Sequence, residues 1–243
     1  MASKVVTFLS DFGTRDSYVA EVKAVLLGAK STPVLVDITH EVPPFDIRWG
    51  AFQLLRAYSY FPKGTVHLAI VDPGVGTTRR AVHVKTRDYH FVGPDNGLLL
   101  WAVRDCERRE KKAAQVFEIE VPAKASITFH GRDLFAPFIA AGLKPAKKSA
   151  PLAGKDIPLP RAQGRKIHGE ILGADHYGNL VTNIPHDRKQ RVEREAENYL
   201  AIKDGQVGLI RGSHGYWELA RREGSAAASL KLKPGDAVSI SLL

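Results

Sequence analysis

The chain has little cysteine and no long apolar segment, and both absences narrow its class. Cys106 is the one cysteine among 243 residues, so neither an internal disulfide nor a cysteine-based zinc site can form. A chain without disulfides suits a reducing compartment, and we expect a cytoplasmic protein. No run of about 18 consecutive apolar residues occurs, which excludes a membrane-spanning helix. The first residues lack the apolar region and cleavage site of a signal peptide, so we expect no secretory leader.

Common cofactor motifs are missing as well. The nine histidines form no H-x-x-x-H or similar pattern, so we expect no catalytic metal and no other cofactor. Gly74 and Gly76 suggest a phosphate loop, but no Lys-Ser/Thr pair follows them and the full dinucleotide fingerprint is absent. Cys106 lies in a charged stretch without a catalytic pattern around it, which argues against a cysteine nucleophile.

Positive charge exceeds negative charge, but it is spread along the chain. The net charge is +9, and basic residues occur in mixed tracts such as 104–112, beside acidic residues. Such tracts are typical of solvated faces and loops. A net charge of this size can favour polyanions, yet no helix-turn-helix pattern or RNA-binding aromatic signature is present. We therefore expect no nucleic-acid partner.

The first half of the chain alternates short β-rich runs with amphipathic helical patterns. The third of these runs is nearly continuous in apolar content, as in a buried parallel strand. This order favours right-handed βαβ units and a sheet covered on both faces. The expected elements are strands at 5–9, 34–38, 66–71, 81–85 and 89–92 and helices at 18–29 and 47–58.

The second half has a different composition. Pro151, Pro158 and Pro160 interrupt any long helix or central strand. Short β-like pieces separated by glycine turns follow and predict a small β-barrel or sandwich. The expected strands are at 167–172, 180–184, 199–202, 207–210, 216–219 and 238–242. We therefore expect an α/β protein with two domains, residues 1–165 and 166–243.

Two aspartates directly follow predicted strands, and glycine follows each of them closely. Asp11 comes after the first strand and Asp72 after the third, at the carboxyl ends where open α/β sheets bind ligands. Glycine lets the backbone approach a ligand. Capping of a turn or helix would explain either aspartate alone. Two at corresponding strand ends favour a ligand site.

Three further polar segments are candidates, each with an ordinary structural explanation. His130 lies in the cluster 128–133, before a helical pattern at 134–141, and is either a site residue or a structural histidine. The segment 175–179 joins two β-like runs and also fits a hairpin turn. The segment 212–216 is a turn by default.

Motifs in a fixed order make the chain resemble one enzyme family. The motifs are SDFG at 10–13, THEVPPFD at 39–46, VDPGVG at 71–76, GPDNG at 93–97 and FHGRD at 129–133, extended by GNLVTNI at 178–184 and GSAA at 224–227. They resemble the S-adenosylmethionine hydroxide adenosyltransferases, which are adenosine-forming S-adenosylmethionine hydrolases related to fluorinase and chlorinase. Each motif alone is weak, but the ordered set covers nearly the whole chain. The resemblance implies a Rossmann-like first domain, a β-barrel second domain and a homotrimer that binds S-adenosylmethionine between neighbouring subunits.

The resemblance also implies a role for each site residue. It places Asp72, Arg79 and His130 at the reacting centre. The implied substrate contacts are Asp11 at the ribose hydroxyls, Asp16 near the nucleoside, Phe45 over the ribose, Gly131 beside His130, Tyr177 stacked near adenine, Asn179 hydrogen-bonded to adenine, and Asp175 and Ser213 at the methionine end. Two departures bear on substrate recognition. His214 stands where halogenase relatives carry arginine, and 221–223 is a charged run where relatives often have a smaller one.

The implied reaction is an in-line attack of water on C5′ that releases adenosine and methionine. His130 and Asp72 would orient water and accept its proton, and Arg79 would hold Asp72 ionised. An aspartate at 72 would repel a halide, which disfavours a halogenase. A non-catalytic nucleoside-binding protein and a basic nucleic-acid-binding module stay as alternatives.

Overall fold

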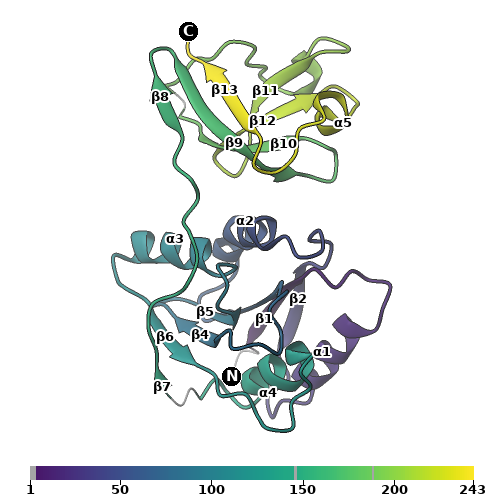
Figure 1. Cartoon of the computed structure of the whole chain (residues 1–243), viewed down its shortest axis with the longest axis vertical. Coiled ribbons are helices and arrows are strands. Elements are labelled where there is room, and N and C mark those ends of the chain that lie inside the picture. Colours follow the sequence, from purple (N-terminus) through teal and green to yellow (C-terminus); the bar gives the residue numbers. More distant parts are fainter. Residues whose placement is uncertain (1–3, 145–146, 188) are drawn as a thin grey trace. The chain divides into compact units, whose positions relative to one another are not determined.

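The structure is a computed structural model that describes residues 4–144, 147–187 and 189–243. Its internal contacts divide the chain into two compact units (Figure 1). The first unit extends to Asp156, and the second runs from Ile157 to Leu243. Within the described residues, no helix combines the length and apolar character needed to cross a membrane.

The first unit is built on a mixed seven-stranded sheet. Its strands, in spatial order, are β2 (Val34–Thr39), β1 (Val5–Ser10), β3 (Val66–Ile70), β5 (His90–Pro94), β4 (Ala81–Lys85), β6 (Gln115–Glu118) and β7 (Lys147–Lys148). The pairs β1–β2, β1–β3 and β3–β5 are parallel, and the pairs from β5 through β4 to β7 are antiparallel. The carboxyl ends of β1 and β3 therefore meet at one edge of the sheet.

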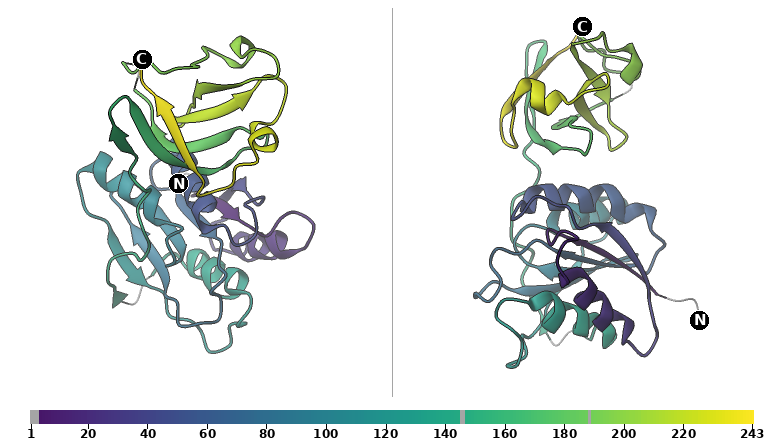
Figure 2. Two further views of the ribbon diagram at one scale, coloured as in Figure 1. Left: turned by 45° about the horizontal axis from the view of Figure 1, so that its top comes forward. Right: turned by 90° about the vertical axis from the view of Figure 1, so that its right-hand side faces the viewer.

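Helices cover both faces of this sheet (Figure 2). Helices α1 (Tyr18–Leu27) and α4 (Ala136–Ala140) lie together on one face, and α2 (Ile47–Ala57) and α3 (Leu100–Glu110) lie together on the other. The core under α1 and α4 includes the fully buried Phe8, Val22, Leu26, Leu68 and Phe135. Full burial of one such side chain contributes about 1.5–3 kcal/mol, so this packing holds the strand ends in place.

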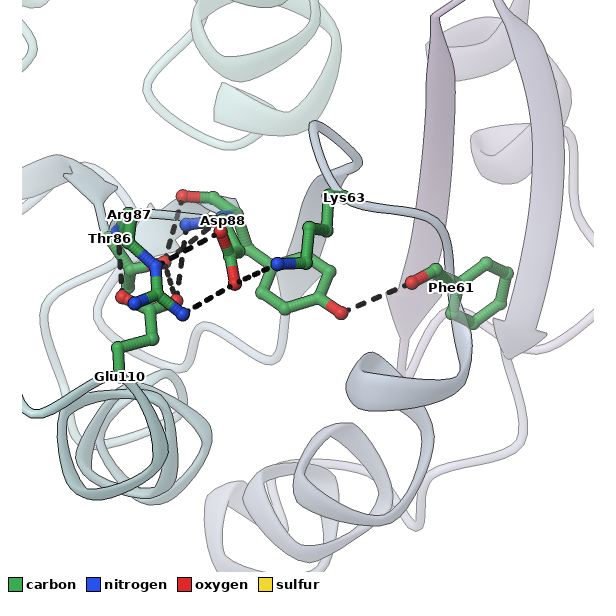
Figure 3. Close-up of polar contacts among 7 residues, drawn as sticks. Phe61, Lys63, Thr86, Arg87, Asp88 and Glu110 are labelled. Carbon is green, nitrogen blue, oxygen red and sulfur yellow. Dashed lines mark hydrogen bonds and ion pairs between the residues drawn. The ribbon is translucent and has the colours of Figure 1, made fainter.

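A buried carboxylate fixes the turn between β4 and β5, at the end of the sheet opposite the carboxyl ends of β1 and β3 (Figure 3). Glu110, the last residue of α3, accepts hydrogen bonds from Thr86 Oγ1 at 3.0 Å and from the backbone nitrogens of Arg87 at 2.7 Å and Asp88 at 3.1 Å. Asp88 also lies 3.0 Å from Lys63 Nζ. The three hydrogen bonds to Glu110 give its buried carboxylate protein donors in place of water, which a buried charged group requires.

Helix α3 and strand β6 are absent from the sequence-based prediction. The tract 104–112 is so rich in charge that its apolar stripe is short. In the structure Val103 and Cys106 are buried while Arg104 and Arg108 are exposed. The amphipathic pattern is therefore real, but it is visible only with Trp101 and its neighbours included.

The second unit is an antiparallel β structure. Its strands, in spatial order, are β11 (Val207–Arg211), β12 (Tyr216–Arg221), β10 (Leu180–Pro185), β9 (Lys166–Ala174) and β13 (Ala237–Ser241), with β8 (Arg161–Gln163) paired to β9. A short helix, α5 (Ala226–Leu230), follows β12. Trp217, Ile184 and Ile240 are buried in its core.

One local prediction is wrong, and another is right except for where the helix begins. The expected strand at 199–202 is a 3₁₀ turn, Tyr199–Ala201, because the Asn198 side chain accepts the Ala201 backbone N–H at 3.1 Å and starts the turn. The helical pattern at 134–141 begins earlier, as a π-helical turn, Gly131–Phe135, that continues into α4. Such turns are frequent at functional sites.

Candidate active site

A cavity of about 410 Å³ lies at the carboxyl ends of β1 and β3. The two strands are parallel neighbours, so the residues that follow them, Asp11 and Asp72, both reach the cavity wall. Phe45, His130 and Gly131 also line it. The structure therefore brings together five of the residues that the resemblance implied, from four separate segments of the first unit.

Asp72, Arg79 and His130 form one hydrogen-bonded cluster. Arg79 Nε donates to the two carboxylate oxygens of Asp72 at 3.0 and 2.9 Å, and Arg79 Nη2 also contacts Asp72. The same Nη2 bonds to Nδ1 of His130 at 2.9 Å. The side chains of Arg79 and Asp72 are only 9% and 5% exposed, and His130 is buried. Charged hydrogen bonds in such a water-poor setting are stronger than at the surface.

The position of Arg79 settles the state of His130. A guanidinium has donors and no acceptor, so Nδ1 of His130 accepts and the neutral ring carries its proton on Nε2. Burial lowers the pKa of His130, and the charge of Arg79 lowers it further, although Asp72 opposes this. His130 is therefore neutral at neutral pH and has an N–H donor on Nε2.

Asp11 joins the loop after β1 to the loop after β2. Its Oδ2 accepts the backbone N–H of Phe45 at 2.9 Å. Phe45 has a φ of 68°, in the left-handed region that side chains other than glycine rarely occupy, and its side chain is 70% exposed. Burial raises the pKa of Asp11, and the nearby Asp72 adds to the rise, while the Phe45 N–H opposes it. A carboxylate and an exposed aromatic ring are thus held side by side at the cavity.

A glycine allows the loop after β3 to reach the segment that carries His130. Gly76 has a φ of 76°, and a Cβ atom there would lie 2.3 Å from the carbonyl oxygen of Ile127. No other residue permits this approach without displacing one of the two backbones. The close packing helps to bring Asp72 and Arg79 within reach of His130.

Asn96 supports the strand end beside Asp72, and its role is one that the sequence analysis missed. Its Nδ2 donates to the carbonyl of Val71 at 2.8 Å, and its Oδ1 accepts the backbone N–H of Leu98 at 3.2 Å. The residue just before Asp72 is thereby fixed to the loop after β5. The GPDNG motif was the available signal, but nothing in it indicated this partner.

An aromatic wall of the cavity was also missed. Phe12, Tyr18 and Phe129 line the cavity, and their ring centroids are 5.2–5.9 Å apart. Two of them adjoin predicted site residues in the sequence, which was the only signal. Asp16, in contrast, is exposed and is not among the residues that line the cavity.

The predicted substrate residues of the second unit form compact turns within that unit. The Asp175 carboxylate accepts the backbone N–H groups of Tyr177 and Asn179 at 3.0 and 2.9 Å and the Asn179 side-chain amide at 3.0 Å. Asn179 is buried, whereas Tyr177 is 77% exposed. A Cβ atom at Gly178 would lie 2.1 Å from Ser225 Oγ, so this turn packs closely against the start of α5. The result is a rigid turn that presents an aromatic ring.

Ser213 and His214 lie in the turn between β11 and β12, with opposite exposures. Ser213 is exposed. The His214 side chain is 1% exposed, its Nε2 lies 2.7 Å from Glu218 Oε1, and its Nδ1 accepts the backbone N–H of Tyr216 at 3.2 Å. His214 thus stabilises the turn from inside the unit, and its buried side chain is not exposed for binding the carboxylate of a substrate.

Among the described residues, neither Cys106 nor a metal-binding group adds a candidate centre. Cys106 is buried, and burial raises the pKa of its thiol to about 12, so little thiolate exists at neutral pH. Among the residues that the structure describes, no group of three His, Cys, Asp or Glu side chains is arranged to hold a metal ion.

The sequence matches two domain models of one family. Residues 6–151 match the SAM hydroxide adenosyltransferase N-terminal domain, and residues 169–239 match the C-terminal domain of the same family. The chain belongs to the SAM hydroxide adenosyltransferase family. The resemblance inferred from the ordered motifs is therefore confirmed.

Several known proteins are similar to nearly the whole chain. An (R)-S-adenosyl-L-methionine hydrolase of Thermus thermophilus is 39% identical over 262 residues, covering 95% of this chain and 96% of the relative. One of Salinispora tropica is 35% identical, covering 97% of each chain. A fluorinase of an Actinoplanes species is 26% identical, covering 98% of this chain and 97% of the relative. A crystal structure of an uncharacterized conserved protein from Thermotoga maritima matches with a TM-score of 0.83 at 33% identity, covering 98% of this chain and 100% of that one.

Proposed function

We propose that this chain hydrolyses S-adenosyl-L-methionine to adenosine and L-methionine by attack of water on the ribose C5′. The observation that carries the proposal is the Asp72–Arg79–His130 cluster, two members of which line the cavity at the ends of β1 and β3. Membership of the SAM hydroxide adenosyltransferase family supports it, as does the hydrolase activity named for relatives that are 39% and 35% identical.

The chemistry of the substrate defines what the site must supply. An oxygen–C5′ bond forms while the C5′–sulfur bond breaks, and the electron pair of the broken bond stays on sulfur. A sulfonium becomes a neutral thioether, which leaves easily, so the barrier lies mainly with the weak nucleophile. A closed site that aligns water with C5′ and sulfur removes several kcal/mol of this barrier. Proton acceptance by a positioned group contributes about 10²- to 10⁴-fold more.

The hydrogen-bond pattern supports a division of labour in the cluster. We assign proton acceptance to Asp72, because Nδ1 of His130 is already occupied by Arg79 and Nε2 carries a proton. His130 then orients the water through its Nε2–H. Arg79 balances the charge of Asp72 through the bonds of its Nε and Nη2, and the same Nη2 fixes the orientation of His130. This refines the sequence-based hypothesis, in which His130 and Asp72 shared proton acceptance.

A local carboxylate offsets the overall charge of the protein. The net charge of +9 does not favour approach of a cationic substrate. Asp11 lines the cavity and supplies negative charge for the sulfonium, whereas the charge of Asp72 is balanced by Arg79. In the proposed complex Asp11 binds the ribose hydroxyls, Phe45 covers the ribose, and Gly131 leaves room beside His130.

The resemblance extends the proposal to architecture and assembly. We propose a Rossmann-like first domain, a β-barrel second domain and a cytoplasmic homotrimer with active sites at subunit interfaces. In that assembly Tyr177 and Asn179 would bind adenine, Asp175 and Ser213 the methionine end, and Asp16 the nucleoside region. The domain limits 1–165 and 166–243 also stay predictions.

A halogenase is the second candidate, because fluorinases are among the relatives. A specific observation weighs against it. Asp72 is buried and lines the cavity, and a halide near that carboxylate would meet like-charge repulsion in a medium of low polarity. We expect no 5′-halo-5′-deoxyadenosine at a rate comparable to that of adenosine release.

The deciding experiment traces the source of the 5′-hydroxyl oxygen of the adenosine that is released. The protein is incubated with S-adenosyl-L-methionine in ¹⁸O-water, and the adenosine formed is examined by mass spectrometry. Label in the 5′-hydroxyl supports attack of water on C5′, and unlabelled adenosine would refute it. Saturable binding without any product would instead favour a non-catalytic nucleoside-binding protein. A parallel incubation with chloride and fluoride tests the halogenase.

A further inference from the structure

Hydrogen bonds connect two loops that line the cavity, through residues that have no role in the proposed reaction. The loop after β1 carries Asp11, and the loop after β2 carries Phe45. Apart from the Asp11–Phe45 bond described above and an exposed bond from Thr14 Oγ1 to Glu41 Oε1 at 3.3 Å, the connections converge on His40. Its ring bonds to Ser10 Oγ through Nδ1 at 2.8 Å, and its backbone carbonyl accepts the N–H of Gly13 at 2.8 Å. One residue of the second loop thus holds the first loop on both sides of Asp11.

The surroundings of His40 make this connection rigid. His40 is 5% exposed and Ser10 is fully buried. The ring of His40 packs edge-on against Phe8, with centroids 4.6 Å apart, and its Nε2 lies 3.1 Å from Asp37 Oδ1. Ser10 Oγ also accepts the backbone N–H of Phe12 at 3.3 Å. Because Ser10 and His40 are both buried, little water can replace the bond between them, and losing it leaves a buried polar group unpaired.

The direction of the Ser10–His40 bond follows from its neighbours. Asp37 beside Nε2 favours the ring proton on that nitrogen, which leaves Nδ1 as the acceptor. The Ser10 hydroxyl therefore donates to Nδ1, and its oxygen accepts from Phe12. The order Ser10–His40–Asp37 resembles a nucleophilic triad, but a fully buried serine hydroxyl cannot meet a substrate. The contacts are suited to positioning.

We propose that His40, through its Nδ1 bond to Ser10, is a positioning residue that sets the ribose-binding geometry of Asp11 and Phe45. This inference rests on the proposed function, in which those two residues bind the ribose. The reacting cluster of Asp72 and His130 lies on other segments, so a disturbed Ser10–His40 bond should weaken substrate binding and leave turnover largely intact.

A pair of substitutions separates positioning from packing. His40→Asn places an oxygen where Nδ1 was and keeps the bond to Ser10, whereas His40→Gln places its polar atoms nearer the position of Nε2 and loses that bond. Asparagine is the smaller side chain, so a purely structural role predicts greater damage from His40→Asn. The proposal predicts the opposite order. Ser10→Ala should behave like His40→Gln, and the double variant should be no worse than either.

The measurements are KM, kcat and substrate dissociation constant for adenosine release, with thermal melting as a check on folding. We expect His40→Gln to raise KM and the dissociation constant about 3- to 10-fold, the effect of one buried neutral hydrogen bond, with kcat changed less than about 2-fold. His40→Asn should stay within about 2-fold of the parent. Equal losses in both variants, a larger loss in His40→Asn, or a fall confined to kcat would each overturn the proposal.

A readout that does not depend on turnover distinguishes this inference from the proposed function. The backbone amides of Gly13 and Phe45 donate across the two loops. Their hydrogen exchange should be faster in His40→Gln than in His40→Asn, and unchanged exchange would refute the positioning role even in an active enzyme. If the parent protein forms no adenosine while the exchange difference is present, the proposed reaction fails and the link between the loops stands.

Discussion

Replacing Asp72 by asparagine tests the reacting cluster most directly. The change keeps the size and shape of the side chain but removes the negative charge that Arg79 faces. Both side chains are buried, at 5% and 9% exposure, so the guanidinium keeps its desolvation penalty and loses its counter-charge. Breaking a buried ion pair from one side lowers stability by about 3–5 kcal/mol, and we expect the lower end because asparagine can still accept one Arg79 hydrogen bond.

Turnover should fall much further than stability explains. Asparagine cannot accept a proton from water, so we expect kcat to drop about 10²- to 10⁴-fold, which corresponds to about 2.7–5.4 kcal/mol in activation free energy. KM should change little, since Asp72 is assigned to the transition state rather than to ground-state binding. Adenosine release is measured by chromatography under single-turnover conditions, and the free energy of unfolding is measured by denaturant titration.

The neighbouring pair offers a matched control. Arg80 Nη2 contacts Asp95 Oδ2, and Asp95 is 2% exposed and also accepts the backbone N–H of Ala153 at 2.7 Å. Arg80 is 27% exposed, against 9% for Arg79, so its pair is the less desolvated of the two. Asp95 is not among the residues that line the cavity. Asp95→Asn should therefore lower stability by about 2–3 kcal/mol and leave kcat within about 3-fold. If Asp95→Asn lost as much turnover as Asp72→Asn, or if Asp72→Asn kept full turnover, the assignment of Asp72 would be wrong.

Three other substitutions or titrations test the rest of the site. Asp11→Ala should raise KM about 10- to 100-fold, because it removes one or more hydrogen bonds to a charged group. An unchanged affinity for the substrate would contradict the assignment of Asp11 to the ribose hydroxyls. Burial and Arg79 lower the pKa of His130 below 6.5, so kcat/KM should fall with decreasing pH along an acidic limb centred below 6.5; a limb centred above 6.5 would contradict this. Gly76→Ala should lower stability by more than about 3 kcal/mol and reduce turnover, because its Cβ would collide with the Ile127 carbonyl. Gly64→Ala is its control, with a φ of 86° and nothing within 4 Å of the new Cβ, and should lose only about 1–2 kcal/mol; equal losses would show that close packing at Gly76 is unimportant.

The sequence was most informative where an ionisable residue comes directly after an apolar run. An acid directly after an apolar run predicts a side chain at a strand end, and this placed Asp11 and Asp72 correctly at the edge of the sheet. The ordered motifs identified the family. The positions of β1, β3 and α2 followed from periodicity, because each of these elements buries several apolar side chains at the expected spacing.

Two elements were predicted wrongly for different reasons. The many charges of α3 obscured the short apolar stripe around Val103, which the fold buries. The segment at Tyr199 turns instead of extending because the Asn198 side chain offers a competing hydrogen bond to the backbone N–H of Ala201. This second signal is local, but the β-like residues that follow Asn198 outweighed it in the prediction.

The sequence by itself determined which residue types were available and which of them stand at strand ends, since burial of apolar runs fixes where a strand stops. Only the tertiary structure decided their partners. Arg79 bonds to Nδ1 of His130, and His40 bonds to Ser10, because the parallel order of β2, β1 and β3 and the close approach at Gly76 bring distant loops together. Hydrogen bonds depend on distance and direction in space, and these are properties of the packed sheet that no spacing along the chain contains.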